Sequence, residues 1–347
     1  MRNLLLIFSI ISLLITSCTC NRNPEQQKQP KKSVEKQKED IHVHIIRFDR
    51  ELFAANPNDI ENEINKYKAK YPLFFPVYYN NVLSLPSAGD KSKQMDVMRE
   101  FVSSASMRGL YDSVQHTFPD LKFLEDDLNI LFTNYTAYFP KKIIPHLFTC
   151  ISEFSYSVFT AGDSMLAFSL DKYLGARYLY YPAVFPEITY LYPTFDKKYI
   201  AIDGAQALAS NIVPPPSDRS TLLDKMLAEG KILYLMQAFL PDKKPNDIIK
   251  YSDKQWKWCN DNEQQIWSYF IEKKLLYDTR FEQFKYVKDG PYTYGMPKES
   301  PGKVGAWVGW KIVQAFMREH PDYTVQQLLD EKDGQKMLTE SMYKPKV

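Results

Sequence analysis

The sequence predicts an α+β protein that is mainly α-helical, with a helical body around a small β-sheet. Several segments repeat apolar residues at helical spacing, whereas only one stretch has the pattern of a β-hairpin. Tyrosine and phenylalanine are abundant, at 24 and 21 residues, and glycine is scarce, at 12. This composition favours an aromatic core between helices over a glycine-turned barrel or sandwich.

The chain begins with a short apolar segment that is typical of a bacterial lipoprotein signal. Residues 4–14 are mainly apolar and are followed by Ile15-Thr16-Ser17-Cys18. A membrane-spanning helix needs roughly 20 apolar residues, so this run is too short to cross a bilayer. We expect residues 1–17 to be a cleaved signal peptide and Cys18 to carry the acyl chains that anchor the mature protein.

Residues 18–40 have the composition of a flexible, lipid-anchored tether. Between residues 21 and 40 only Val34 is apolar, which is too little to offset the entropy of ordering the segment. Thr19, rather than an acidic residue, follows Cys18. We therefore expect attachment to the outer membrane, with the protein facing the periplasm.

Residues 41–347 are predicted to form a single domain. They contain no Gly/Ser-rich linker and no repeat of fixed period. The net charge of +2, without a dense basic patch, argues against nucleic acid as a partner.

Two helices are indicated in the first two thirds of this domain. Residues 58–70 place apolar side chains at helical spacing before two prolines. Ser220 is the expected N-cap of a helix that runs to Phe239.

Further helix starts follow toward the C-terminus. Ser252 with Gln255 forms a capping box, and Thr324 with Gln327 repeats that pattern. Ser300-Pro301 is expected to open a helix that ends near Arg318. After Thr324 we expect a pair of short helices, broken near Asp333-Gly334.

The β signal is confined to a small part of the chain. Residues 154–159 and 165–170 flank Gly162-Asp163-Ser164, a pattern that predicts a hairpin. Residues 199–203 are a third extended candidate. Cys150 and Cys259 lie in segments expected to fold, and either a disulfide or two separately buried thiols fits the sequence.

Known catalytic patterns are missing. The five histidines include no pair four residues apart, so the helix of a zinc peptidase is absent, and exposed positions are expected for His42 and His44. No Gly-x-Ser-x-Gly elbow or phosphate loop is present. Scattered carboxylates remain as acid or base candidates, but the sequence does not show which pair meets. We therefore expect no metal and no cofactor.

A tyrosine-rich segment, residues 173–199, is the first candidate for a functional surface. Prolines interrupt it, so its aromatics must lie on looped or extended backbone. They could line a groove for a sugar or peptide, or wedge a large loop onto the core. The tyrosines that we place on a candidate ligand or partner surface are Tyr178, Tyr180, Tyr181, Tyr190 and Tyr192.

The second candidate is a pair of glycine-containing helices. Glu229-Gly230-Lys231 lies within an apolar helix, and Gly302, Gly305 and Gly309 lie near the start of another. Glycines spaced three and four residues apart share a helix face and permit close approach of a neighbouring backbone. Glu229, Lys231, Trp307 and Trp310 complete the candidate surface.

Several runs of the chain resemble the gliding motility lipoprotein GldB family of the Bacteroidetes. They are residues 220–242 (STLLDKMLAEGKILYLMQAFLPD), residues 299–313 (ESPGKVGAWVGWKIV) and Asp171-Lys172-Tyr173-Leu174-Gly175. The resemblance implies a distant relation to zincin-like peptidases, with Glu229-Gly230 and the segment 305–309 as later elements. The His-Glu-x-x-His helix has no counterpart, which implies a zincin-like body without metal.

Three functional hypotheses follow. We favour a non-catalytic, lipid-anchored envelope protein of the gliding or type IX secretion machinery, which binds or scaffolds a protein partner. The alternative is a glycan- or peptide-binding lipoprotein that uses residues 173–199. A hydrolase in which Glu229 is catalytic is the third.

Overall fold

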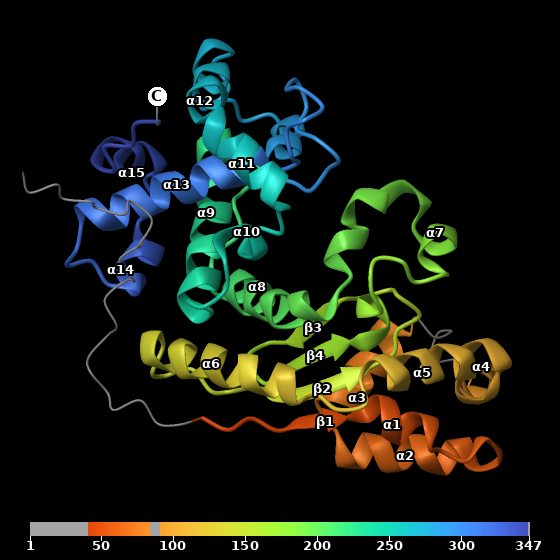
Figure 1. The fold of residues 1–347 in the computed structure, drawn as a ribbon. Coiled ribbons are helices and arrows are strands. Elements are labelled where there is room, and N and C mark those ends of the chain that lie inside the picture. The colour runs from red at the N-terminus through yellow and green to blue at the C-terminus, as the bar shows by residue number, and fades with distance from the viewer. Residues whose placement is uncertain (1–40, 84–90, 346–347) are drawn as a thin grey trace, which may run out of the picture.

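The computed structural model describes residues 41–83 and 91–345. Its centre is a four-stranded sheet in the order β1-β2-β4-β3 (Figure 1). The strands are β1 (Ile45–Arg47), β2 (His146–Cys150), β3 (Val158–Ala161) and β4 (Met165–Ser169). β1, β2 and β4 are parallel, and β3 pairs antiparallel with β4. This is the predicted hairpin, but its first strand begins at Val158 rather than at Phe154. Every residue of β4 is buried, as expected for a strand that is covered on both faces.

Helices cover the sheet and then build a second layer on top of it. The described helices are α1 (Phe48–Phe53), α2 (Ile60–Lys70), α3 (Phe74–Val77), α4 (Lys91–Ser103), α5 (Ala105–Thr117), α6 (Lys122–Tyr138), α7 (Tyr181–Val184), α8 (Ile200–Ile212), α9 (Leu222–Phe239), α10 (Pro245–Ile248), α11 (Asp253–Asp261), α12 (Glu263–Glu272), α13 (Val304–Glu319), α14 (Val325–Asp330) and α15 (Gly334–Glu340). Figure 1 shows α1, α2 and α3 below the sheet, α8 above it, and α9 to α15 beyond α8. The mainly helical α+β prediction is confirmed.

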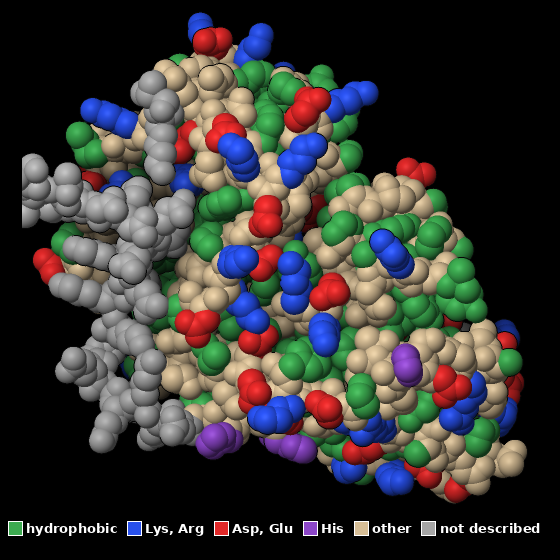
Figure 2. All heavy atoms as spheres, in the orientation of Figure 1, with side chains coloured by type: hydrophobic (Ala, Val, Ile, Leu, Met, Phe, Trp, Pro, Cys, Tyr) green, Lys and Arg blue, Asp and Glu red, His purple; other side chains and the backbone are tan. Residues whose placement is uncertain are grey.

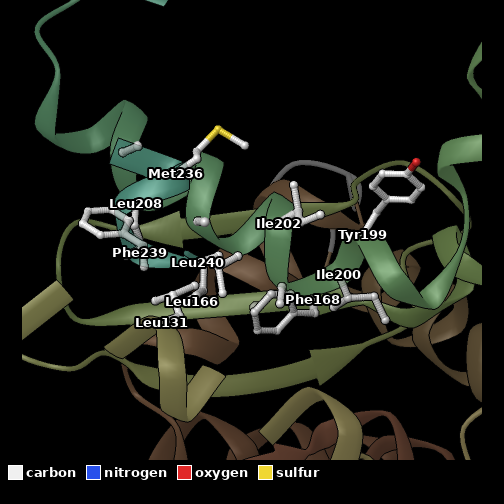
Figure 3. Close-up of a cluster of buried hydrophobic side chains, with 14 of the residues drawn as sticks. Leu131, Leu166, Phe168, Tyr199, Ile200, Ile202, Leu208, Met236, Phe239 and Leu240 are labelled. Atoms are coloured by element: carbon white, nitrogen blue, oxygen red, sulfur yellow. The ribbon is translucent and has the colours of Figure 1, made fainter. Parts of the chain in front are cut away.

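The layers share one apolar core. Leu166 and Phe168 of β4 pack under Ile200 and Ile202 of α8, and the end of α9 joins them through Phe239 (Figure 3). All five side chains are essentially removed from water, so the hydrophobic effect ties the sheet to the helical layer above it.

The contact between α9 and α13 is a backbone-to-backbone crossing, as the glycine spacing predicts. A Cβ added at Gly230 would lie 2.4 Å from the carbonyl carbon of Gly309. A Cβ at Gly309 would lie 1.8 Å from the carbonyl oxygen of Met226. Any larger residue at either glycine would separate the two helices.

Several predicted helix starts are confirmed. Ser252 with Gln255 and Thr324 with Gln327 both form complete capping boxes. The final pair of short helices is broken where expected, and Asp333 caps the second of them. The helix after residue 220 begins one residue late, because Thr221 and Asp224, rather than Ser220, form its capping box.

The predicted helix start at Ser300-Pro301 is wrong. The hydroxyl of Ser300 accepts the backbone N–H of Thr293, and the chain makes a further turn through Lys303, whose φ is +48°. α13 begins at Val304, whose N–H donates to the hydroxyl of Thr293. A residue eleven positions away thus supplies the acceptor that was expected from the local sequence.

The extended run predicted for residues 199–203 is also wrong. Asp196 accepts the backbone N–H of Lys198 and starts a helical turn that leads into α8. The beginning of α8 is buried on several sides, so its apolar run does not show the one-sided pattern of a surface helix. Cys150 and Cys259 are free, buried thiols.

The signal peptide, the lipidation site Cys18 and the tether lie outside the described residues, and those expectations remain predictions. Within residues 41–83 and 91–345, no helix is both long and apolar enough to cross a bilayer.

Candidate functional site

The chain that leaves β4 carries a buried aspartate and lysine at the carboxyl end of the parallel strands. Asp171 is fully buried and accepts the backbone N–H groups of Ser152, at 3.2 Å, and Phe154, at 2.6 Å. Burial raises the pKa of Asp171 to about 7, although these N–H donors act in the opposite direction. The carboxyl end of parallel strands is where α/β proteins commonly place functional groups.

Lys172 lies among aromatic rings rather than in water. Its ammonium donates to the carbonyl oxygen of Phe154 at 3.2 Å. It lies 3.5 Å from the ring centre of Phe185 and 4.7 Å from that of Phe195, within the range of a cation–π interaction. Burial lowers the pKa of Lys172 to about 8.

Two tyrosines fasten the tyrosine-rich segment to this pair. The hydroxyl of Tyr181 donates to the carbonyl oxygen of Asp171 at 3.1 Å and accepts the N–H of Leu174 at 3.0 Å. The hydroxyl of Tyr192 lies 3.0 Å from the carbonyl oxygen of Tyr181 and 2.9 Å from that of Phe185. We call this group the tyrosine clamp: Asp171, Lys172, Tyr181, Phe185, Tyr192 and Phe195.

Residues 173–199 were expected either to line a ligand groove or to wedge a large loop onto the core. For most of their aromatic side chains the clamp supports the second interpretation. Tyr181 is completely buried, so placing it on a surface was wrong, because its ring fills the core and its hydroxyl bonds the backbone. Tyr178 is half-buried and its hydroxyl lies 3.3 Å from that of Ser113 on α5. The segment is wedged onto the core.

The clamp leaves a small apolar tip in water. Leu179 is 78% exposed, Tyr180 55% and Val184 42%, and the neighbouring Pro182 and Ala183 are exposed as well. We call these five residues the α7 tip. Figure 2 shows hydrophobic side chains gathered at this side of the molecule, where Figure 1 places α7.

A polar cleft of about 640 Å³ lies on the other side of the same segment. One wall is the end of the tyrosine-rich segment, including Tyr190, and the others are α10 with the start of α11 and the loop at residues 291–300. The lining residues are Tyr190, Pro193, Thr194, Lys198, Tyr199, Lys244, Asn246, Asp247, Lys250, Tyr251, Ser252, Asp253, Lys254, Gln255, Pro291, Lys298, Glu299 and Ser300. Charged side chains of both signs lie over α10 and α11 in Figure 2.

Two of the cleft lysines hold its walls together. Lys198 pairs with Asp247 at 2.9 Å, which joins the tyrosine-rich segment to α10. Lys250 pairs with Asp203 of α8, and Asp203 also accepts the hydroxyl of Tyr173 at 2.7 Å. These ion pairs cross between the two layers of the molecule.

Glu229 and Lys231 do not line the cleft. Burial raises the pKa of Glu229, and Lys303, which is paired with Asp289 at 2.7 Å, opposes that rise. Lys231 is buried and donates to the carbonyl oxygen of Glu331 at 2.6 Å, which ties α9 to the loop after α14, so its placement on a surface was wrong.

The placement of Trp307 and Trp310 on a surface was wrong. Their side chains are 0% and 1% exposed, because α13 is buried against α9 along most of its length. Neither indole N–H has a hydrogen-bond acceptor within the described structure. These residues belong to the core.

Sequence reasoning missed both the clamp pair and the cleft lysines. Asp171 was one of the scattered carboxylate candidates and Asp171-Lys172 was part of the family resemblance, but no periodicity marks the pair as a site. The lysines Lys244, Lys254 and Lys298 are dispersed over 55 positions, and only the fold brings them to one cleft. Among the described residues, no three His, Cys, Asp or Glu side chains are grouped as a metal site would require.

Comparison with known proteins gives one match. The family model described as gliding motility protein GldB matches residues 27–345, nearly the whole chain. No curated protein and no solved structure matches it.

Proposed function

Because the chain belongs to the gliding motility protein GldB family and is a gliding-motility-related lipoprotein, we propose that it acts without catalysis, by binding a protein partner in the cell envelope. In this proposal Cys18 anchors the protein to the outer membrane and the body faces the periplasm. The α7 tip is the anchor point for the partner.

The rigid display of the α7 tip supports this proposal. The hydroxyls of Tyr181 and Tyr192 hold the backbone around α7. Tyr181 donates to the carbonyl oxygen of Asp171 and accepts the N–H of Leu174, and Tyr192 shares its one hydrogen between two carbonyl oxygens. The exposed parts of the tip side chains add little to the stability of the fold, since burial is what stabilises apolar groups. A preorganised apolar anchor is the kind of group that dominates protein interfaces, because little entropy is lost when it docks.

The size of the tip indicates which kind of partner fits it. Three large apolar side chains on one short turn cover far less than the roughly 800 Å² per partner that a stable interface buries, so two tips packed together would not make a dimer. The tip suits an apolar pocket on a different protein. The remaining contact area lies along the same segment, which continues from the tip into the wall of the cleft.

Site-specific photo-crosslinking in the host cell tests the proposal. A photoreactive phenylalanine analogue replaces Tyr180, and a control variant carries it at Tyr277, which is also exposed but lies outside the tip and the cleft. We expect one light-dependent adduct with an envelope protein from position 180 and none from position 277. No adduct from position 180, or the same adducts from both positions, would contradict the proposal.

A further inference from the structure

The cleft has a surplus of positive charge that its own acidic residues do not neutralise. Five lysines and three acidic side chains line it. Lys198 and Lys250 are paired, whereas Lys244, Lys254 and Lys298 are exposed and their side-chain ammonium groups have no hydrogen-bond or ion-pair partner in the described structure.

The three acidic residues of the cleft leave part of its positive charge unmatched. Asp247 is the partner of Lys198, and Asp253 accepts the side-chain N–H of the buried Asn246 at 2.8 Å. Asp253 keeps its charge in that hydrogen bond with a neutral amide, so Asp253 and Glu299 together oppose the three unpaired lysines and one positive charge is left over. These lysines come from three places, just before α10, within α11 and in the loop at residues 291–300, so the positive charge belongs to two walls of the cleft.

We propose that the cleft binds an acidic peptide segment of a protein partner, with Lys244, Lys254 and Lys298 contacting its carboxylates. This inference rests on the proposed function, that the protein acts by binding a partner. It goes further by assigning the chemistry of that partner and a second contact site, separate from the α7 tip.

The other lining groups favour a peptide over a phosphate. No arginine lines the cleft, although arginine is the residue whose planar fork matches phosphate oxygens in pairs. Tyr190, Asn246 and Gln255 add an aromatic ring and two side-chain amides, which are groups that bind peptide backbone and side chains. A volume of about 640 Å³ is enough for several residues of an extended chain.

The test is direct binding of fluorescent peptides to the purified protein. The probe is a short peptide of alternating Glu and Ser, and its counterpart carries Gln in place of Glu. We expect the acidic peptide to bind, the Gln peptide not to bind, and the affinity to fall as salt screens the charges. Equal binding of both peptides, or no binding of the acidic one, would overturn the inference.

A charge-matched pair of variants locates the binding site. The variant K244E/K254E/K298E reverses the three cleft lysines, and K141E/K273E/K332E reverses three exposed lysines outside the cleft with the same change in net charge. We expect a loss of about tenfold or more in the first variant and much less in the second. Equal losses would show that only net charge matters and would contradict a site in the cleft.

Two further arms separate this inference from alternatives. Inorganic phosphate should not displace the acidic peptide at matched ionic strength, and strong displacement would identify a phosphate site instead. The variant L179S/Y180S/V184S should keep full peptide affinity, because the α7 tip lies outside the cleft. Failure of peptide binding therefore counts against the cleft alone. Crosslinking from position 180 tests the proposed function independently.

Discussion

The tyrosine clamp and the crossing of α9 with α13 hold their parts of the molecule in different ways. The clamp uses hydroxyls, a buried carboxyl and an ammonium over aromatic rings. The crossing uses backbone contact at Gly230 and Gly309. The crossing closes a core and leaves nothing exposed, whereas the clamp holds an apolar tip out in water. Polar bonds thus hold the displayed tip, whereas the helix crossing rests mainly on packing, with the hydrogen bond of Lys231 beside it.

The largest loss of stability should come from adding a methyl group where α9 and α13 cross. In G309A the new methyl group would overlap the carbonyl oxygen of Met226, so α9 and α13 must move apart. We expect a loss of stability on the order of 5 kcal/mol, measured by urea unfolding. A loss below about 1 kcal/mol would show that α9 and α13 can move apart at little cost. Close backbone contact would then not be what holds the crossing together.

The next effect concerns the buried carboxyl of the clamp and depends on pH. The pKa of Asp171 is raised from 3.8 to about 7 in the folded protein, so the unfolded chain loses the proton first and stability falls as pH rises from 4 to 7. D171N lacks this titration. We expect the free energy of unfolding of the wild type to fall relative to D171N by about 2–4 kcal/mol over that range.

Urea unfolding at pH 4 and at pH 7 measures this difference. Both pH values lie below the lowered pKa of Lys172, about 8, so that lysine stays charged throughout. A constant difference between the two proteins would mean that Asp171 is ionised across the range, held so by its backbone donors.

A smaller loss is expected from removing one clamp hydroxyl. In Y181F the buried carbonyl oxygen of Asp171 loses its donor and the partly buried N–H of Leu174 loses its acceptor, which should cost about 1–3 kcal/mol. Y180F is the matched control, since Tyr180 is exposed, and should change stability by less than about 0.5 kcal/mol. Equal Tm values for the two variants would show that the clamp bonds add nothing to stability.

The smallest change in stability is expected at Gly109, which, unlike Gly309, has open space beside it. Gly109 lies inside α5, and a Cβ there would meet nothing within 4 Å. G109A should therefore stabilise the protein by about 0.5–1 kcal/mol, through the better helix propensity of alanine. If G109A and G309A were equally destabilising, the crossing at Gly309 would have no special status.

The same contrast explains what could be predicted from the sequence. Glycine spacing and the capping boxes at Ser252 and Thr324 are local patterns, and the structure confirms them. The clamp and the α13 start depend on partners that are distant or outside the helix. Thr293 caps α13 from eleven residues away, and no periodicity links Asp171 to Ser152.

The candidate surface was only partly predictable for a similar reason. Tyr180 is exposed and Tyr190 lines the cleft, but Tyr181, between them in the same segment, is buried. Alternation along looped backbone has no fixed period, so the sequence cannot assign each ring to water or to the core. The buried tryptophans of α13 show the same limit for a helix that is covered on nearly every side.

The affinity of the purified protein for the partner that is trapped from position 180 decides whether the α7 tip is a binding surface. It should be measured for the wild type and for L179S/Y180S/V184S. We expect the Kd to rise about tenfold or more while the Tm stays the same, because the tip is an exposed anchor. An unchanged Kd in a folded triple variant would contradict the role assigned to the tip.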